Sequence, residues 1–338
     1  MKKKLYFSLI LILLSVFGAN GEVYTTPDGH RFEVNLIPDK TEIMIGEPLF
    51  LSFEVKNLSD VDLSFSHGGD YRNRLGRPLS FEVEAVRSDG KKVPVPEIKF
   101  NMGGLVGPRK VEKNGGTQVI RLFLPLWAPF EETGEYSISC VKSLGIRQIA
   151  GKSQTTDYSN VTGVPVAVKT KLKVVAGNEA KMSELVDFWG EKIITAEWEK
   201  SYEAIKALDF IGGKRIIKPL VKALNSEGIS TREFIIRLLG KFADEEAFSA
   251  IVAQMGNEKA NVRGVVAEAL SFNKHPKAFE YLLKLKDDED KFVRLSVMQA
   301  LGRIGTTESI AILREMIKED RNKEFYEYVK FFLEKNEK

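Results

Sequence analysis

The chain has 338 residues, of which 43% are hydrophobic and 29% charged, a composition typical of a globular protein with room for two domains. Its net charge is +3, from 50 basic and 47 acidic side chains. Without Lys2, Lys3 and Lys4 the two signs balance at 47 each, so the sequence lacks the basic excess of a nucleic-acid-binding protein.

The first residues, 1–21, are typical of a secretory signal peptide. Three lysines precede an apolar run from Leu5 to Phe17, and Ala19 and Gly21 place small residues at a cleavage site. We therefore expect a secreted or periplasmic protein, cleaved near Gly21/Glu22. The apolar run is short for a membrane span, so no integral span is expected after cleavage; the alternative is an uncleaved anchor.

Residues 22–176 are dominated by a period of two, which is typical of strands with one buried and one solvated face. The alternation is clear at 49–56, 61–66, 79–85 and 164–174. Turn-forming sequences punctuate it at 27–29, 88–90 and 114–116. Because no helical period interrupts the series, we expect an antiparallel β-sandwich rather than parallel βαβ units.

The segment 132–136 (Glu-Thr-Gly-Glu-Tyr) resembles the tyrosine corner of immunoglobulin-like domains. The stretch from Ile37 to Asn57 is also similar to the start of many bacterial immunoglobulin-like modules. The resemblance implies an immunoglobulin-like sandwich, although the cysteine pair of antibody domains is absent. The single cysteine, Cys140, shares a strand face with Tyr136 and Ile138, so we expect a buried core thiol rather than a nucleophile or an intermolecular link.

Residues 201–338 repeat every 31 residues. Four columns share this interval: Leu208, Leu239, Leu270, Leu301; Ile217, Phe248, Phe279, Ile310; Leu220, Ile251, Leu282, Leu313; and Ala207, Leu238, Ala269, Ala300. Apolar residues within each unit have helical spacing, and a period of this length is typical of a solenoid of stacked helix hairpins. We expect four hairpins and a C-terminal capping helix in 201–338, after a linker and N-terminal capping helix in 177–200.

The first helices of these units resemble HEAT-like repeats of the short bacterial type, as in phycobilin lyases. The similarity is carried by Asn261-Val262-Arg263 with Ala269-Leu270, and by Phe292-Val293-Arg294 with Ala300-Leu301-Gly302. It implies an armadillo-like helical solenoid; the first unit departs by having Ser201 at the arginine position. The arginines at 232, 263 and 294 are either a ladder for a ligand or, as we expect, staples between units, with Asp290 as the partner of Arg294.

No residue pattern indicates catalysis, a cofactor or a metal, and no partner-binding residue can be assigned. His67-Gly68-Gly69-Asp70 lies in a predicted loop and lacks a second histidine at metal spacing. Trp127 is either a sugar-stacking aromatic or, as we expect, a core or hinge residue. Two second-helix rows, 215/246/277/308 and 222/253/284/315, mix both charge signs.

These patterns favour an exported, non-enzymatic scaffold that binds a protein or peptide through the solenoid, with no cofactor. The alternatives are a lyase-like enzyme of the phycobilin-lyase HEAT type, and an extracytoplasmic inhibitor or carbohydrate-binding module that acts through the sandwich.

Overall fold

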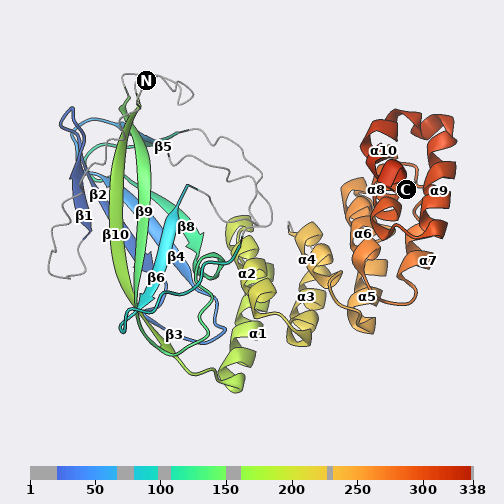
Figure 1. Cartoon of the computed structure of the whole chain (residues 1–338), viewed down its shortest axis with the longest axis horizontal. Coiled ribbons are helices and arrows are strands. Elements are labelled where there is room, and N and C mark those ends of the chain that lie inside the picture. Colours follow the sequence, from blue (N-terminus) through green and yellow to red (C-terminus); the bar gives the residue numbers. More distant parts are fainter. Residues whose placement is uncertain (1–20, 67–79, 98–107, 150–160, 227–230, 336–338) are drawn as a thin grey trace, which may run out of the picture. The chain divides into compact units, whose positions relative to one another are not determined.

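The computed structural model describes residues 21–66, 80–97, 108–149, 161–226 and 231–335 (Figure 1). The chain divides into two compact units. One comprises Met1–Ile43 with Leu49–Val175 and holds the strands, and the other comprises Met44–Pro48 with Ala176–Lys338 and holds the helices.

The first unit is built from two open sheets. The four-stranded sheet has the order β1-β2-β4-β8, with bounds Glu22–Thr25, Arg31–Pro38, Phe50–Asn57 and Thr117–Phe123. The six-stranded sheet has the order β3 (Glu42–Met44), β10 (Thr162–Val175), β9 (Gly134–Gln148), β5 (Leu63–Ser66) and β7 (Arg109–Val111). The sixth strand, β6 (Glu82–Arg87), also pairs with β9. Every register described is antiparallel, as predicted. Figure 1 shows β9 and β10 as a long central pair.

Aromatic side chains join the two sheets in the core. Phe32 of the first sheet meets Phe65 of the second with ring centroids 5.6 Å apart, and Phe53 meets Phe81 at 5.2 Å. Cys140 is fully buried, which confirms the predicted core thiol, and burial raises its pKa to about 12. A thiol with so high a pKa stays protonated and is a poor nucleophile.

The predicted tyrosine corner is present. The Tyr136 hydroxyl donates to the backbone oxygen of Glu132 at 2.8 Å, and the Tyr136 ring packs edge-on against Phe130 at 4.7 Å. Gly134, between them, has φ +150, a conformation that side chains rarely adopt. The short 3₁₀ helix η1 (Leu124–Leu126) precedes this corner.

The second unit is a stack of helix hairpins. Their pairs are α2/α3 (Trp198–Ile211, Ile217–Leu224), α4/α5 (Arg232–Leu239, Glu245–Val252), α6/α7 (Ala260–Phe272, Ala278–Leu283) and α8/α9 (Lys291–Ile304, Thr307–Lys318). The 3₁₀ helices η2 (Lys214–Ile216) and η3 (Asp320–Phe325) lie before α3 and after α9. The leucine column at 208, 239, 270 and 301 is at most 1% exposed, so the period marks the shared core of the stack.

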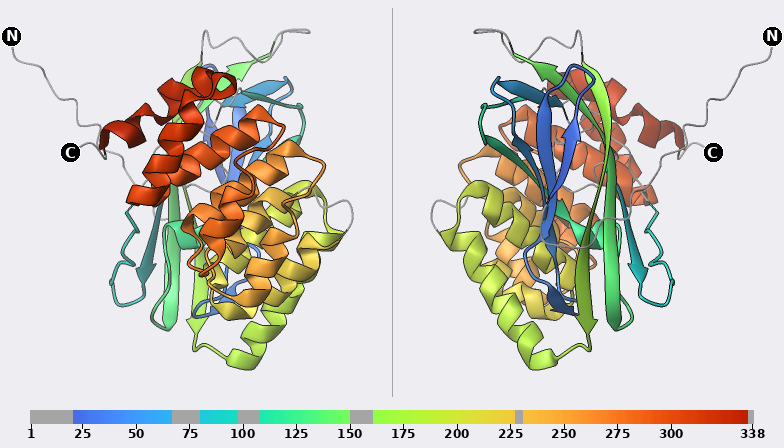
Figure 2. Two further views of the ribbon diagram at one scale, coloured as in Figure 1. Left: turned by 90° about the vertical axis from the view of Figure 1, so that its right-hand side faces the viewer. Right: turned by 90° about the vertical axis from the view of Figure 1, so that its left-hand side faces the viewer.

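A half-hairpin stands at each end of the stack, at the two places where capping helices were predicted. In α1 (Glu179–Thr195), Val186 and Trp189 lie 31 residues before Ile217 and Leu220, so α1 has the register of a second helix. In α10 (Tyr326–Lys335), Phe332 lies 31 residues after the last column leucine, so α10 has the register of a first helix. Figures 1 and 2 agree that α1 and α10 lie at opposite ends of the stack.

Both end helices carry exposed aromatic side chains. Phe188 of α1 is 49% exposed and Tyr328 of α10 is 63% exposed. Met182, Val186 and Ile193 make the buried face of α1.

Candidate binding surface

The arginine column has the most site-like geometry of the helical unit. Arg232, Arg263 and Arg294 each occupy the same place in a first helix, 31 residues apart. Arg263 and Arg294 are only 8% and 6% exposed. Buried cations require partners, so their contacts decide whether a ligand is needed.

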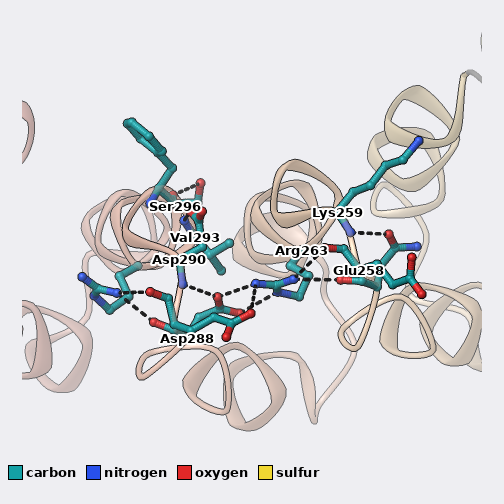
Figure 3. Close-up of polar contacts among 11 residues, drawn as sticks. Glu258, Lys259, Arg263, Asp288, Asp290, Val293 and Ser296 are labelled. Carbon is teal, nitrogen blue, oxygen red and sulfur yellow. Dashed lines mark hydrogen bonds and ion pairs between the residues drawn. The ribbon is translucent and has the colours of Figure 1, made fainter.

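Arg263 is held by a carboxylate and two backbone oxygens (Figure 3). Its Nε and Nη2 donate to the two oxygens of Asp288 at 2.8 and 2.7 Å, and Nη1 donates to the backbone oxygens of Asn257 and Glu258 at 2.8 and 3.4 Å. The hydrogen bond from Arg263 holds the pKa of the Asp288 carboxyl below its ordinary value. The bidentate pair therefore joins helix α6 to the loop before α8, and the Nη1 bonds tie the same side chain to the loop before α6.

Arg294 repeats this arrangement with a neutral partner. Its Nε donates to Asn322 Oδ1 at 2.9 Å, and Nη1 donates to the backbone oxygens of Asp288 and Glu289. Asp290, the partner expected from the sequence, instead caps α8. Its carboxylate accepts hydrogen bonds from the backbone nitrogens of Phe292 and Val293 (Asp290 and Val293 are labelled in Figure 3). That expectation was wrong because an aspartate at an N-cap is oriented towards free backbone N–H groups.

Arg232, and Ser201 at the equivalent position of the first unit, also form hydrogen bonds to neighbouring segments. Arg232 donates to the backbone oxygens of Leu224 and Ser226. Ser201, which stands at the arginine position of the first unit, is buried; its hydroxyl donates to the Ile193 oxygen at 2.9 Å and lies 3.0 Å from the Thr231 hydroxyl. The column thus bonds the units to one another from end to end, which favours staples over a ligand ladder.

The second-helix rows are exposed, but much of their charge is already paired within the unit. Arg215 contacts Glu179, and Lys222 contacts Glu191. Lys284 pairs with Glu280 one turn away. These rows contain no aromatic side chain.

The first helices carry a second surface, which was not predicted from the sequence. It is mostly half-buried: Lys241, Phe272 and Arg303 are exposed, whereas Val265 is only 7% exposed. We define the first-helix face as positions i, i+3 and i+7 of each first helix: Glu203, Lys206, Phe210; Phe234, Arg237, Lys241; Val265, Glu268, Phe272; Ser296, Gln299, Arg303. Positions with this spacing share one side of a helix, so the signal was available in the sequence.

Aromatic and basic side chains lie next to one another on this face. Phe272 is 43% exposed, and a Cβ placed on Gly240 would lie 2.8 Å from its ring, so the ring crosses the backbone of the preceding unit. The Arg237 guanidinium lies 6.0 Å from the ring centroid of Phe234 and pairs with Glu268 at 2.9 Å. Aromatic residues and arginine are the types enriched in protein interfaces.

The remaining sequence candidates do not join this surface. Trp127 is 3% exposed and packs in the first unit, which supports the core assignment over sugar stacking. His67 and Asp70 lie outside the described residues. His275 stacks on Phe248 at 3.8 Å, and its Nε2 lies 2.9 Å from Glu245 Oε2, so it links two units.

Within the described ranges, no group of three or more His, Cys, Asp and Glu side chains is placed to hold a metal ion. Among the described helices, none combines the length and apolar character that a membrane span requires.

Comparison with known proteins gives a family for the helical unit. The family model for HEAT repeats matches residues 186–271 and 249–325. No curated protein matches the chain. One similar solved structure is human deoxyhypusine hydroxylase in complex with glycerol, with 26% sequence identity and a TM-score of 0.33; the match covers 35% of this chain and 43% of that one. Another is the complex of CpcE and CpcF of phycocyanin lyase from Nostoc, with 20% identity and a TM-score of 0.37; the match covers 48% of this chain and 100% of that one. The chain spans less than half of the hydroxylase.

The matched range begins inside α1 and ends at Phe325, just before α10. It therefore covers the four hairpins together with part of the N-terminal half-hairpin. We conclude that residues 186–325 are HEAT repeats, which follow a domain of open, antiparallel sheets.

Proposed function

We propose that this chain is an exported, non-enzymatic scaffold that holds a protein or peptide partner along the first-helix face. The observation that supports it most is the half-exposed ring of Phe272, which occupies the same repeat position as Lys241 one unit before it and Arg303 one unit after it. Stacked repeats present such a row as one extended surface, so a partner gains contacts from several units at once.

Charge on the first-helix face supports a partner with some acidic character. The face has four basic and two acidic side chains, and the acidic Glu268 is already bound by Arg237. Lys241 pairs with Asp209 at 2.6 Å, but this pair is exposed and contributes little to stability, so a partner carboxylate can replace Asp209 at small cost.

The test is a photo-crosslinking series in the native host. A photoreactive residue at position 272 is expected to give one discrete adduct that recurs between preparations, because the partner covers that ring. In a pull-down without the photoreactive residue, the substitution Phe272→Glu should then reduce recovery of that same partner by about tenfold or more, as for a central aromatic contact.

The matched control is Ala311→Glu, which adds the same carboxylate to an exposed position of second helix α9. Equal loss of partner in both variants, or adducts only from second-helix positions, would place binding elsewhere. A covalent pigment adduct after co-expression with a bilin and its carrier protein would favour the lyase-like alternative.

A further inference from the structure

The outward face of α10 is aromatic rather than polar. Tyr328 and Phe331, one turn apart, are 63% and 64% exposed. Val329 and Leu333 on the other side are buried. A terminal repeat that met only water would be expected to carry polar residues outward.

The repeat register shows what these two positions do in earlier units. Stepping back from Tyr328 in 31-residue intervals gives Val297, Val266, Ile235 and Ala204, each 0% exposed. The same steps from Phe331 give Ala300, Ala269, Leu238 and Ala207, each at most 4% exposed. Both aromatics therefore lie at positions that are core in every other hairpin.

The exposure follows from the elements that pack on each helix. First helix α6 packs against α4 on one side and against α7 and α8 on the other. The main packing partners of α10 are α8, α9 and η3, all of which precede it. Within the described chain, the face that later elements cover in α6 is uncovered in α10.

Charges flank the two aromatics in a symmetric order. Glu324, at the end of η3, lies four residues before Tyr328, and Lys335 lies four residues after Phe331. Glu324 also pairs with Lys291 at 3.3 Å, but both side chains are about half-exposed, so a second copy can compete for the carboxylate. A two-fold axis midway between Tyr328 and Phe331 places Tyr328 of one copy opposite Phe331 of the other, and the reverse. The same axis sets Glu324 opposite Lys335, so the stripe is complementary to itself.

We propose that the α10 stripe, defined as Glu324, Tyr328, Phe331 and Lys335, docks against the same stripe of a second copy in an antiparallel, two-fold arrangement. The four aromatic rings of the two copies then occupy the core positions that the repeat period assigns to them, and acid and base meet at each end.

A two-fold pairing is favoured over head-to-tail stacking on α1. On α1, Met182 is 8% exposed and its Cε lies 3.4 Å from a Cβ placed on Gly46, so the segment Met44–Pro48 of the same unit covers part of that helix. The C-terminal end has no such cover among the described residues.

The size of the stripe sets the strength of the contact. Phe292, 62% exposed, extends the patch, since its ring lies 6.5 Å from Phe325, which in turn lies 6.3 Å from Tyr328. Three exposed aromatics per copy still make an interface at the low end of specific ones, so the dimer should dissociate on dilution.

Analytical ultracentrifugation of the full chain over about 1 to 200 µM tests the proposal, because this span brackets a weak dissociation constant. We expect a monomer–dimer equilibrium. Phe331→Glu should leave only monomer, because it places two carboxylates in the aromatic centre. Phe188→Glu, at the exposed aromatic of α1, should leave the equilibrium unchanged.

Charge reversal distinguishes this geometry from general hydrophobic association. Glu324→Lys should weaken dimerisation by about 3- to 30-fold, since two like-charge contacts replace two attractive ones, and the double variant Glu324→Lys with Lys335→Glu should restore it. A chain that is monomeric throughout, assembles without limit, or dimerises equally with Phe331→Glu would overturn the proposal; circular dichroism confirms that each variant is folded.

Discussion

At the scale of single residues, the buried Arg263–Asp288 pair provides the sharpest stability test. The side chains are 10% and 8% exposed. Arg263→Met leaves Asp288 buried without its cation and should lower the free energy of unfolding by about 2–4 kcal/mol. Arg237→Met breaks an ion pair whose side chains are 35% and 34% exposed, and should cost less than about 1 kcal/mol.

Urea unfolding followed by circular dichroism measures both variants. At acid pH, the difference in free energy of unfolding between the wild type and Arg263→Met should become smaller. The pKa of Asp288 is lowered in the folded state, so its contribution is present above the ordinary value of 3.8 and is lost as the pH falls through the folded pKa. Equal costs for the two arginines would contradict the staple role.

Lys142 is a cation that the fold disfavours. It faces the sandwich core from β9, only 3% exposed; its Nζ donates to the Ser80 oxygen at 3.1 Å and lies 4.3 Å from the Phe81 ring centroid. Burial lowers its pKa from 10.5 to about 8. The unfolded chain therefore holds this proton more tightly, and stability should rise between pH 8 and pH 10.5.

Lys142→Met should raise the melting temperature at pH 7 by about 2–4 °C, because the desolvated charge is removed. The gain should shrink at pH 10, where the folded wild type is largely neutral at this position. Thermal melts at the two pH values measure it, with the exposed Lys169→Met as the control. A gain that is independent of pH would show that packing, and not charge, limits stability here.

At the scale of elements, the contact between α8 and α10 depends on Gly302. A Cβ at this position would lie 2.4 Å from the Phe332 ring, so Gly302→Ala must displace α10. We expect a cost of about 1–3 kcal/mol and faster proteolysis within α10, because overpacking separates the helices. Limited proteolysis with mass spectrometry locates the cuts.

Gly256→Ala is the matched control for that substitution. A Cβ there meets nothing within 4 Å, so stability should be unchanged or slightly higher. If both glycine variants behaved alike, backbone propensity rather than the close approach of Phe332 would explain the result.

Periodicity predicted these elements better than it predicted their partners. The leucine columns located all four hairpins, and the alternation around Cys140 located β9, because burial on one face imposes a period directly on the sequence. The same alternation puts Lys142 inward, although its charge argues against burial. The partner of Arg294 was predicted wrongly and that of Arg263 was not predicted, since Asp288 and Asp290 differ by two residues and only loop geometry decides which of them binds an arginine and which caps α8.

At the scale of the whole molecule, the end helices were predicted as caps, but their place in the repeat was not predicted. Trp189 and Phe332 fit the 31-residue columns, but a single helix offers too few positions to show a period without its hairpin partner. The first-helix face was missed because its members differ in type between units.

The export proposal makes a prediction at this scale. β1 begins at Glu22, directly after the expected cleavage site, so cleavage there leaves the first sheet intact. Protein recovered from the native host should have Glu22 as its N-terminus, as measured by Edman sequencing or intact mass. Recovery of residues 1–21 in the mature protein would contradict it.

The shared arginine staple also makes the middle of the array modular. Arg232 and Arg263 each donate to backbone oxygens that lie a few residues before them in the chain. Thr231 directly precedes Arg232, and Val262 directly precedes Arg263. Excising residues 232–262 therefore places Arg263 directly after Thr231, facing the same kind of acceptors. Such an array can be shortened by one module while each surviving joint keeps its chemistry, whereas a cut that is not a whole number of repeats would misplace the arginine at the new junction relative to its acceptors.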